Sequence, residues 1–353
     1  MKKRLAVLLS LGIILSMCAC GGNDAATDTA TEKATEAVTE AVTEAVTENI
    51  DSDVADEGAE DTSDEGVEDS AEAASEKVER VIHDIASVTD AGDGKYTCTY
   101  DDIEHEFILC APEETSGAPL IVLLHGYGQS AEIMKSNINM DEAANAAGYG
   151  VVYVSGSCSP NVTPSLLGWN SGTVGFGIMG YDDVGFLIAL ANYMKQEYSF
   201  AEDRIYAGGF SNGAFMTHRL AMENDGTYAG FISVAGKMPE SIWENKNETN
   251  DVSFFQITGE KDDIIGKHSD GSAENFKDPA IEDVMDYWAT TSGLSLSETV
   301  ELENGELKKY SADGKKNQVW DLLVKDGGHS WPTEDINKID ANALILEFTE
   351  SLK

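Results

Sequence analysis

The stretch Gly209-Phe210-Ser211-Asn212-Gly213 decides the fold because of what surrounds it. An apolar run at residues 204–207 precedes it, and a helix-like segment at 214–222 follows it. A glycine on each side of a serine lets the chain turn sharply from a strand into a helix. That turn exposes the hydroxyl and directs the helix N-terminus at it. The pattern therefore predicts a nucleophilic Ser211 at the end of a buried strand.

Two later loops carry the partners that such a serine requires. The apolar run 254–257 leads into Thr258-Gly259-Glu260-Lys261-Asp262-Asp263, and the run 318–324 leads into Asp326-Gly327-Gly328-His329. The order serine, acid, histidine along the chain is that of α/β-hydrolases, and it differs from the orders in the chymotrypsin and subtilisin folds. We therefore predict a serine hydrolase of the α/β class.

Each of these residues has a defined chemical role. A free hydroxyl is a poor nucleophile at neutral pH, so Ser211 needs a base, for which His329 is the candidate. Asp262 would fix the imidazole tautomer and stabilise the imidazolium. Asp263 is the alternative acid because it adjoins Asp262, and the alternative for His329 is an ordinary surface-loop histidine.

The loop after the first buried run, 120–124, reads His125-Gly126-Tyr127-Gly128. In an α/β-hydrolase this position supplies half of the oxyanion hole. We expect the backbone N–H groups of Tyr127 and Asn212 to point at the developing negative charge. His125 itself is expected to be structural.

The N-terminal residues predict export. A basic start, Met1-Lys2-Lys3-Arg4, precedes an apolar stretch at residues 5–17 that is too short for a transmembrane helix. We predict a lipoprotein signal peptide at 1–19 and lipidation of Cys20, which follows a small residue. Cys18 fits less well, and an ordinary secretory peptide cut nearby is the alternative.

Residues 20–80 are predicted to be a disordered acidic tether. Between residues 21 and 80 there are 20 acidic residues and three basic ones, a net charge of −17, and the tetrapeptide Thr-Glu-Ala-Val repeats from Thr35. Such a segment buries too little apolar surface to offset chain entropy, and its charges repel one another. Binding of cations or of a basic partner is the alternative role.

Residues 81–353 are predicted to form one catalytic domain. With 44 acidic residues against 17 basic ones, it is not expected to bind nucleic acid or anionic lipid. No cysteine or histidine spacing resembles a metal site, and no cofactor is predicted. Cys98 and Cys110 either form a disulfide across an early hairpin or remain free thiols.

Strand-like and helical runs alternate through this domain, which predicts a mostly parallel sheet covered on both faces. The expected strands are 120–124, 151–154, 204–207, 231–234, 252–257 and 318–324. The expected helices are 141–147, 182–196, 214–222, 281–290 and 335–352. Residues 95–100 and 105–110 are expected to form an antiparallel lead-in, and 155–181 the rim of the active site.

Several motifs together resemble one family. They are His125-Gly-Tyr-Gly-Gln-Ser130, Trp169-Asn170, Tyr181-Asp182-Asp183-Val184-Gly185-Phe186, Gly209-Phe-Ser-Asn-Gly213 and Gly327-Gly-His-Ser-Trp-Pro332. The set is similar to the secreted polyhydroxybutyrate depolymerase-like esterases, whose relatives include feruloyl and acetylxylan esterases. The resemblance covers residues 95–350 and implies an α/β-hydrolase fold.

The chain departs from this family in two places. The family usually has His-Gly-Thr-x-Asp in the acid loop, whereas Thr258-Gly259-Glu260-Lys261-Asp262 stands here. The spacing from the glycine is kept, so the role of Asp262 carries over, but a loop-supporting histidine is missing. Of the two substrate-loop cysteines seen in some members, only Cys158 is present.

Two tryptophans, Trp169 and Trp331, are predicted to contact substrate, because a flat indole stacks on a sugar face or an aromatic acyl group. For both, packing inside the domain is the alternative. Asp182 and Asp183 open a helix and are expected to cap it rather than bind a metal.

We therefore predict a lipid-anchored serine carboxylesterase, on the bacterial cell surface, that deacylates plant polysaccharides or oligosaccharides. A polyhydroxyalkanoate depolymerase is the alternative within the same reaction class. A peptidase is less favoured because no propeller domain is present. A non-catalytic binding lipoprotein is disfavoured because all three triad residues are present.

Overall fold

The computed structural model describes residues 80–158, 166–173, 180–265 and 278–353. The predicted signal peptide at 1–19, the lipidation of Cys20 and all of the predicted tether except Arg80 lie outside these ranges. Within them, none of the helices combines the length and the apolar character needed to cross a bilayer.

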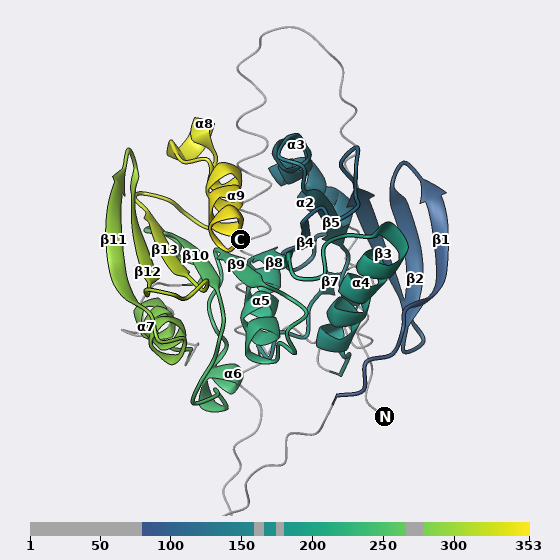
Figure 1. The fold of residues 1–353 in the computed structure, drawn as a ribbon, viewed down its shortest axis with the longest axis horizontal. Coiled ribbons are helices and arrows are strands. Elements are labelled where there is room, and N and C mark those ends of the chain that lie inside the picture. Colours follow the sequence, from purple (N-terminus) through teal and green to yellow (C-terminus); the bar gives the residue numbers. More distant parts are fainter. Residues whose placement is uncertain (1–79, 159–165, 174–179, 266–277) are drawn as a thin grey trace, which may run out of the picture. The chain divides into compact units, whose positions relative to one another are not determined.

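An eleven-stranded sheet forms the centre of the domain, in the order β1-β2-β3-β5-β4-β8-β9-β10-β13-β12-β11 (Figure 1). Its six central strands are parallel to one another. In spatial order they are β5 (Gly150–Val154), β4 (Leu120–Leu124), β8 (Ile205–Phe210), β9 (Gly230–Val234), β10 (Phe254–Gly259) and β13 (Val319–Val324). The predicted α/β-hydrolase fold with a mostly parallel sheet is confirmed.

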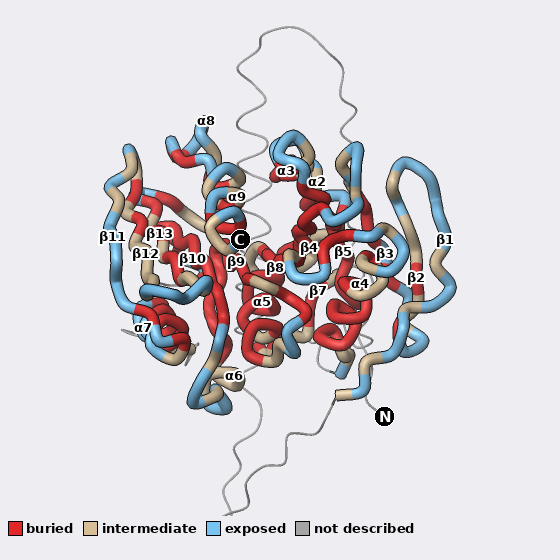
Figure 2. Tube along the Cα trace, viewed as in Figure 1, coloured by how far each residue is buried: buried red, intermediate tan, exposed pale blue. Residues whose placement is uncertain are grey.

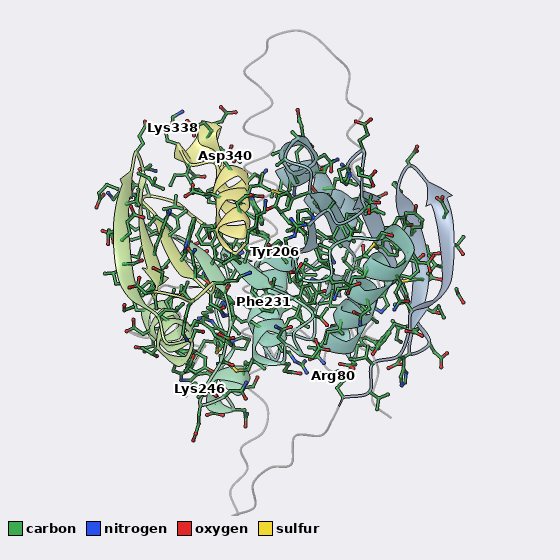
Figure 3. The ribbon with its side chains drawn as sticks, in the orientation of Figure 1. Arg80, Tyr206, Phe231, Lys246, Lys338 and Asp340 are labelled. Carbon is green, nitrogen blue, oxygen red and sulfur yellow. The ribbon has the colours of Figure 1, made fainter. Side chains whose placement is uncertain are left out.

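Helices cover both faces of this sheet (Figure 1). One face packs against α2 (Ala131–Ile138), α3 (Met140–Ala146) and α9 (Ala341–Ser351), and the other against α4 (Asp183–Tyr198), α5 (Asn212–Met222) and α7 (Ile281–Thr291). The two faces bury separate apolar clusters, to which the residues Tyr206 and Phe231 of Figure 3 respectively belong. Central strands buried on both faces explain the continuous apolar runs in the sequence.

Antiparallel strands extend the sheet at both edges, and the residues of the two outermost strands, β1 and β11, are mostly exposed (Figure 2). One edge consists of β1 (Ala86–Gly92), β2 (Lys95–Tyr100) and β3 (Ile103–Cys110), and the other of β12 (Gly305–Ser311) and β11 (Ser295–Leu302). The β2–β3 hairpin is the predicted lead-in, and its turn places Asp101 and Asp102 in the left-handed region. The β11–β12 hairpin was not predicted.

The cysteines of the lead-in are free thiols. Cys98 on β2 lies opposite His105, whereas Cys110 at the end of β3 lies opposite Val151 of the other neighbouring strand. The two residues therefore occupy different strand pairs, and the free-thiol alternative holds.

The C-terminal helix is shorter than the predicted 335–352. A short helix, α8 (Glu334–Asn337), ends at Lys338, which has φ 56°, before α9 begins (Figure 3). The Asp340 side chain accepts a hydrogen bond from Ala343 N at 3.0 Å and so starts α9 as its N-cap. The remaining elements are β6 (Ser157–Cys158), β7 (Leu167–Gly168) and α6 (Glu240–Glu244).

Candidate active site

Ser211 lies between the end of β8 and the start of α5, in a strained backbone conformation with φ 52° and ψ −118°. The flanking glycines are required by close approach. A Cβ at Gly209 would lie 2.2 Å from Gly213 O, and one at Gly213 would lie 2.2 Å from Leu124 O. The turn is also tied to β9, because Ser211 N donates to Val234 O at 3.0 Å. The sequence pattern thus reflects a tightly packed turn that presents the hydroxyl.

His329 lies in the loop after β13 and reaches both of its expected partners. Its Nε2 lies 2.9 Å from Ser211 Oγ, and its Nδ1 lies 2.9 Å from Asp262 Oδ2. The Phe210 ring packs against the imidazole at a centroid distance of 5.2 Å. The structure therefore brings Ser211, His329 and Asp262 together in one hydrogen-bonded chain.

Of the two candidate acids, Asp262 is the one that contacts His329. Its side chain is buried, and its second oxygen, Oδ1, accepts hydrogen bonds from the backbone N–H groups of Ile264 and Ile265 at 3.0 and 3.1 Å. These bonds fix the carboxylate orientation, and they suit an ionised acid. Asp263 is exposed.

The acid loop and the histidine loop are joined to each other. Glu260 N donates to Val324 O at 2.8 Å, and Lys261 N donates to Gly327 O at 2.6 Å. The Lys261 ammonium also pairs with Asp326 on the surface. We call residues 259–263 together with 324–329 the acid–base unit.

The expected oxyanion loop lies beside the nucleophile. A Cβ at Gly126 would lie 3.4 Å from Ser211 Cβ, which places this loop against Ser211. The loop is held by Gly128 N, which donates to Leu167 O at 2.7 Å, and by Gln129 N, which donates to Gly126 O at 3.1 Å. Tyr127 and Asn212 therefore lie on two segments that flank Ser211.

Comparisons with known proteins find similarity to esterases. Residues 189–293 match the Phospholipase/Carboxylesterase family model. NocK of Nocardia uniformis subsp. tsuyamanensis, a protein named as an esterase, is 28% identical over 247 residues, covering 63% of this chain and 68% of NocK.

Two fungal esterases are also similar. The bifunctional acetylxylan esterase/xylanase XynS20E of Neocallimastix patriciarum is 25% identical over 227 residues, covering 63% of this chain. Feruloyl esterase B of Thermothelomyces thermophilus is 30% identical over 115 residues, covering 33% of this chain. The matches span only 30% and 38% of those two proteins.

The chain is a carboxylic-ester hydrolase of the α/β-hydrolase fold. The family-model match at residues 189–293 runs from within α4 to α7 and contains Ser211 and Asp262.

His125 of the hydrolase is buried, and both of its ring nitrogens contact the backbone. Gly156 N donates to Nε2 at 2.9 Å, so Nε2 is the acceptor and Nδ1 carries the proton that it donates to Gly126 O at 2.7 Å. Burial lowers the pKa of His125 to about 4, so the imidazole is neutral at physiological pH. These contacts fit the expected structural role.

Neither of the tryptophans predicted to bind substrate is exposed. Trp169 is 1% exposed, and its indole Nε1 donates to His125 O at 2.9 Å. Trp331 is 8% exposed, and its Nε1 donates to Asn342 Oδ1 at 3.0 Å. Both rings are packed inside the hydrolase, which favours the packing alternative; contact with substrate stays a prediction. Their burial depends on neighbours that are distant in sequence.

The two acids that open α4 have different environments. Asp182 is the N-cap, and its Oδ1 accepts a hydrogen bond from Gly185 N at 3.1 Å. Arg80 binds Asp182 and Glu223 at once, with distances of 2.9 and 2.6 Å (Figure 3). Asp183 is buried, which raises its pKa to about 7. Among the described residues, no group of three or more histidines, cysteines and acids could hold a metal ion.

Sequence reasoning missed the function of the Asn212 side chain. Its Oδ1 accepts a hydrogen bond from Trp169 N at 2.7 Å, and its Nδ2 donates to Ser171 Oγ at 3.3 Å. The motif Trp169-Asn170 and the asparagine after the nucleophile were the available signals, but only the fold shows that they touch.

Proposed function

We propose that this hydrolase is an exported serine carboxylesterase that removes acyl groups from plant polysaccharides or their fragments. The observation that carries the proposal is the pair of 2.9 Å hydrogen bonds that link Ser211 Oγ through His329 to Asp262. A hydroxyl, an imidazole and a buried carboxylate in this order are the parts required for acyl transfer through a serine.

In the proposed reaction, His329 Nε2 takes the proton of Ser211 as Oγ attacks the ester carbonyl carbon. The carbonyl oxygen becomes an oxyanion that Tyr127 N–H and Asn212 N–H stabilise, and one such donor is typically worth roughly 3 kcal/mol. The imidazolium then protonates the leaving alcohol, which leaves an acyl group on Ser211. A water molecule, deprotonated by His329, hydrolyses this ester and releases the acid.

Asp262 completes the mechanism by accepting a hydrogen bond from the Nδ1–H group of His329, which keeps its proton throughout. The two backbone hydrogen bonds to its other oxygen hold the carboxylate in place throughout the reaction. This arrangement keeps Nε2 as the nitrogen that faces Ser211 and stabilises the positive imidazolium.

The substrate class rests on the named relatives, which include an acetylxylan esterase and a feruloyl esterase. The acidic N-terminal segment predicted from the sequence would give a surface-anchored enzyme reach toward a bulky polymer. Labelling of cells with palmitate tests the anchor: a Cys20→Ser chain should lose the label if Cys20 is lipidated, whereas equal labelling would contradict the anchor.

The decisive experiment measures acid released by the purified full chain from acetylated and from feruloylated xylan. Release of acetate or ferulate by the natural chain, abolished by Ser211→Ala, supports the proposal and identifies the acyl group. If only short synthetic esters are cleaved, the polysaccharide substrate is wrong. If no ester is cleaved in a Ser211-dependent way, the serine mechanism is wrong.

A polyester depolymerase is the second candidate, because apolar side chains are exposed on segments next to the site. Ile133, on α2 after the oxyanion loop, is 44% exposed, and Ile264, two residues after Asp262, is 45% exposed. Exposed apolar side chains suit adsorption to a hydrophobic polymer. Release of hydroxybutyrate from polyhydroxybutyrate granules, without release of acid from xylan, would favour this candidate.

A further inference from the structure

Trp169 makes hydrogen bonds to both segments that flank Ser211. The backbone N–H group of Trp169 donates to Asn212 Oδ1 at 2.7 Å, and the Trp169 carbonyl oxygen accepts a hydrogen bond from Asn212 Nδ2 at 3.4 Å. From its side chain, the indole Nε1 donates to His125 O at 2.9 Å. One residue thus touches the start of α5 through its backbone and the oxyanion loop through its indole.

We infer that Trp169 is a positioning residue that sets the separation between the two halves of the oxyanion hole. The inference rests on the proposed function, in which Tyr127 N–H and Asn212 N–H stabilise the oxyanion. Tyr127 is two residues after His125, whose carbonyl the indole binds, and Asn212 itself binds the Trp169 backbone. The His125 side chain is itself held in place, because its imidazole bonds to the backbone of Gly126 and of Gly156.

The position of these donors matters because they stabilise charge that develops only during the reaction. An oxyanion donor must lie within about 2.7–3.1 Å of the place that the oxygen will occupy, and small displacements are costly. Trp169 is 1% exposed, so its indole hydrogen bond has no water to replace it. Loss of this bond should therefore let the oxyanion loop move relative to Asn212.

The variant Trp169→Phe tests the inference, since it removes the indole N–H and keeps an aromatic ring. Trp288→Phe is the matched control. Trp288 is also buried, on α7, and its Nε1 has no hydrogen-bond partner among the described residues. Both variants make the same chemical change inside the core, but only Trp169→Phe breaks the bridge.

The first measurement is hydrolysis of p-nitrophenyl acetate by the full chain. We expect Trp169→Phe to lower kcat about tenfold with KM nearly unchanged, because the lost interaction acts mainly in the transition state. The second measurement is inhibition by phenylboronic acid, whose boron bonds to Ser211 Oγ and places an oxygen in the oxyanion hole. We expect its inhibition constant to rise by a similar factor, and both constants to be unchanged in Trp288→Phe.

A Trp169→Phe chain that keeps kcat and boronic acid affinity within twofold of the natural chain overturns the inference. An equal loss in Trp288→Phe also overturns it, because the effect would then be general packing. If Trp169→Phe does not fold, Asn212→Ala removes the other end of the bridge, and unchanged boronic acid affinity in that variant overturns the inference.

A double variant sharpens the result. Because both changes break one bridge, Trp169→Phe combined with Asn212→Ala should lose less activity than the product of the two single losses. Fully multiplicative losses would mean that the residues act separately, against the inference. If the natural chain neither cleaves the ester nor binds boronic acid, the proposed function fails as well, an outcome distinct from failure of Trp169→Phe alone.

Discussion

The parallel strands at the centre of the sheet and the antiparallel strands at its edges differ in what covers them. Every residue of β4, β5 and β9 is buried, whereas β1 and β11 are mostly exposed. The candidate site lies at the ends of the central strands, and no part of it lies on the edge hairpins. The difference indicates that substitutions in the centre affect both stability and activity, whereas substitutions at the edges affect neither strongly.

The largest expected effect is on activity in the centre, from Asp262→Asn. The amide is neutral and can place its own N–H group against Nδ1, so the tautomer and the positive charge of His329 are no longer supported. We expect kcat on a synthetic ester to fall by about 10³–10⁴. Asp263→Asn is the matched control and should stay within twofold of the natural chain. Equal effects of the two changes would mean that the acid is misassigned.

The next largest expected difference is in the free energy of unfolding, when a glycine of the centre and one of the edge are each replaced by alanine. Gly213→Ala would place a Cβ 2.2 Å from Leu124 O in the centre, and overpacking of this kind costs up to about 3 kcal/mol. Gly92→Ala, in the β1–β2 turn, meets no atom within 4 Å, although its φ of 86° is unfavourable for alanine. We expect it to cost about 1 kcal/mol. Urea unfolding of both variants measures the two losses of unfolding free energy. Similar losses would contradict the contrast between centre and edge.

Acid should weaken the domain through its buried histidines, two of which, His125 and His218, lie at the centre and one, His105, on the edge strand β3. Burial lowers the pKa of His125 and His105 to about 4, and that of His218 to about 3, from an ordinary 6.5. The unfolded chain therefore binds protons that the folded chain does not between about pH 6.5 and 4. The contribution of these histidines to stability should be complete above pH 6.5 and be lost as the pH drops through this window.

His218→Gln is the variant that tests this pH dependence. It should reduce the slope of unfolding free energy against pH by about 1.4 kcal/mol per pH unit at most, the value for one proton. A slope in His218→Gln equal to that of the natural chain would contradict the assignment.

The smallest effect is expected at the edge. Leu296 on β11 is 54% exposed, so Leu296→Thr should change the free energy of unfolding by less than about 0.5 kcal/mol. Leu123→Thr, in β4, buries a hydroxyl in an apolar cluster and should cost several times more. Denaturant unfolding at one pH measures both, and a large loss from Leu296→Thr would show that the edge is not tolerant.

The same contrast explains what the sequence could predict. The central strands, with both faces buried, stand out as apolar runs, and the loops with Ser211, Asp262 and His329 follow directly from them. In the β11–β12 hairpin, β11 is mostly exposed and most of β12 is half-buried, so neither strand has a comparable continuous apolar run. Local signals therefore indicated the candidate site, and they missed the outermost strands β1 and β11 and the partner strand β12.

The tryptophans show the limit of such signals. Trp169 lies in a stretch rich in glycine and serine, which suggested an exposed rim. Its burial depends on Asn212, 43 residues later, and on His125, 44 residues earlier. Contacts at this separation are set by the assembled sheet, and a single sequence does not reveal them. The break before α9 was missed for the opposite reason, because it depends on one local residue, Lys338, in a left-handed conformation that lysine rarely adopts.

The acid–base unit is held together independently of Ser211, so the side chain at position 211 could be changed by itself. Asp262 and His329 are joined by backbone bonds between their own two loops, while Ser211 is tied separately to β9. An exchange of the Ser211 hydroxyl would therefore leave the backbone bonds of the acid–base unit in place. A cysteine at position 211 would inherit a complete proton acceptor and its orienting carboxylate. The scaffold is thus a starting point for thiol-based acyl transfer, in which an added amine or alcohol takes the acyl group in place of water.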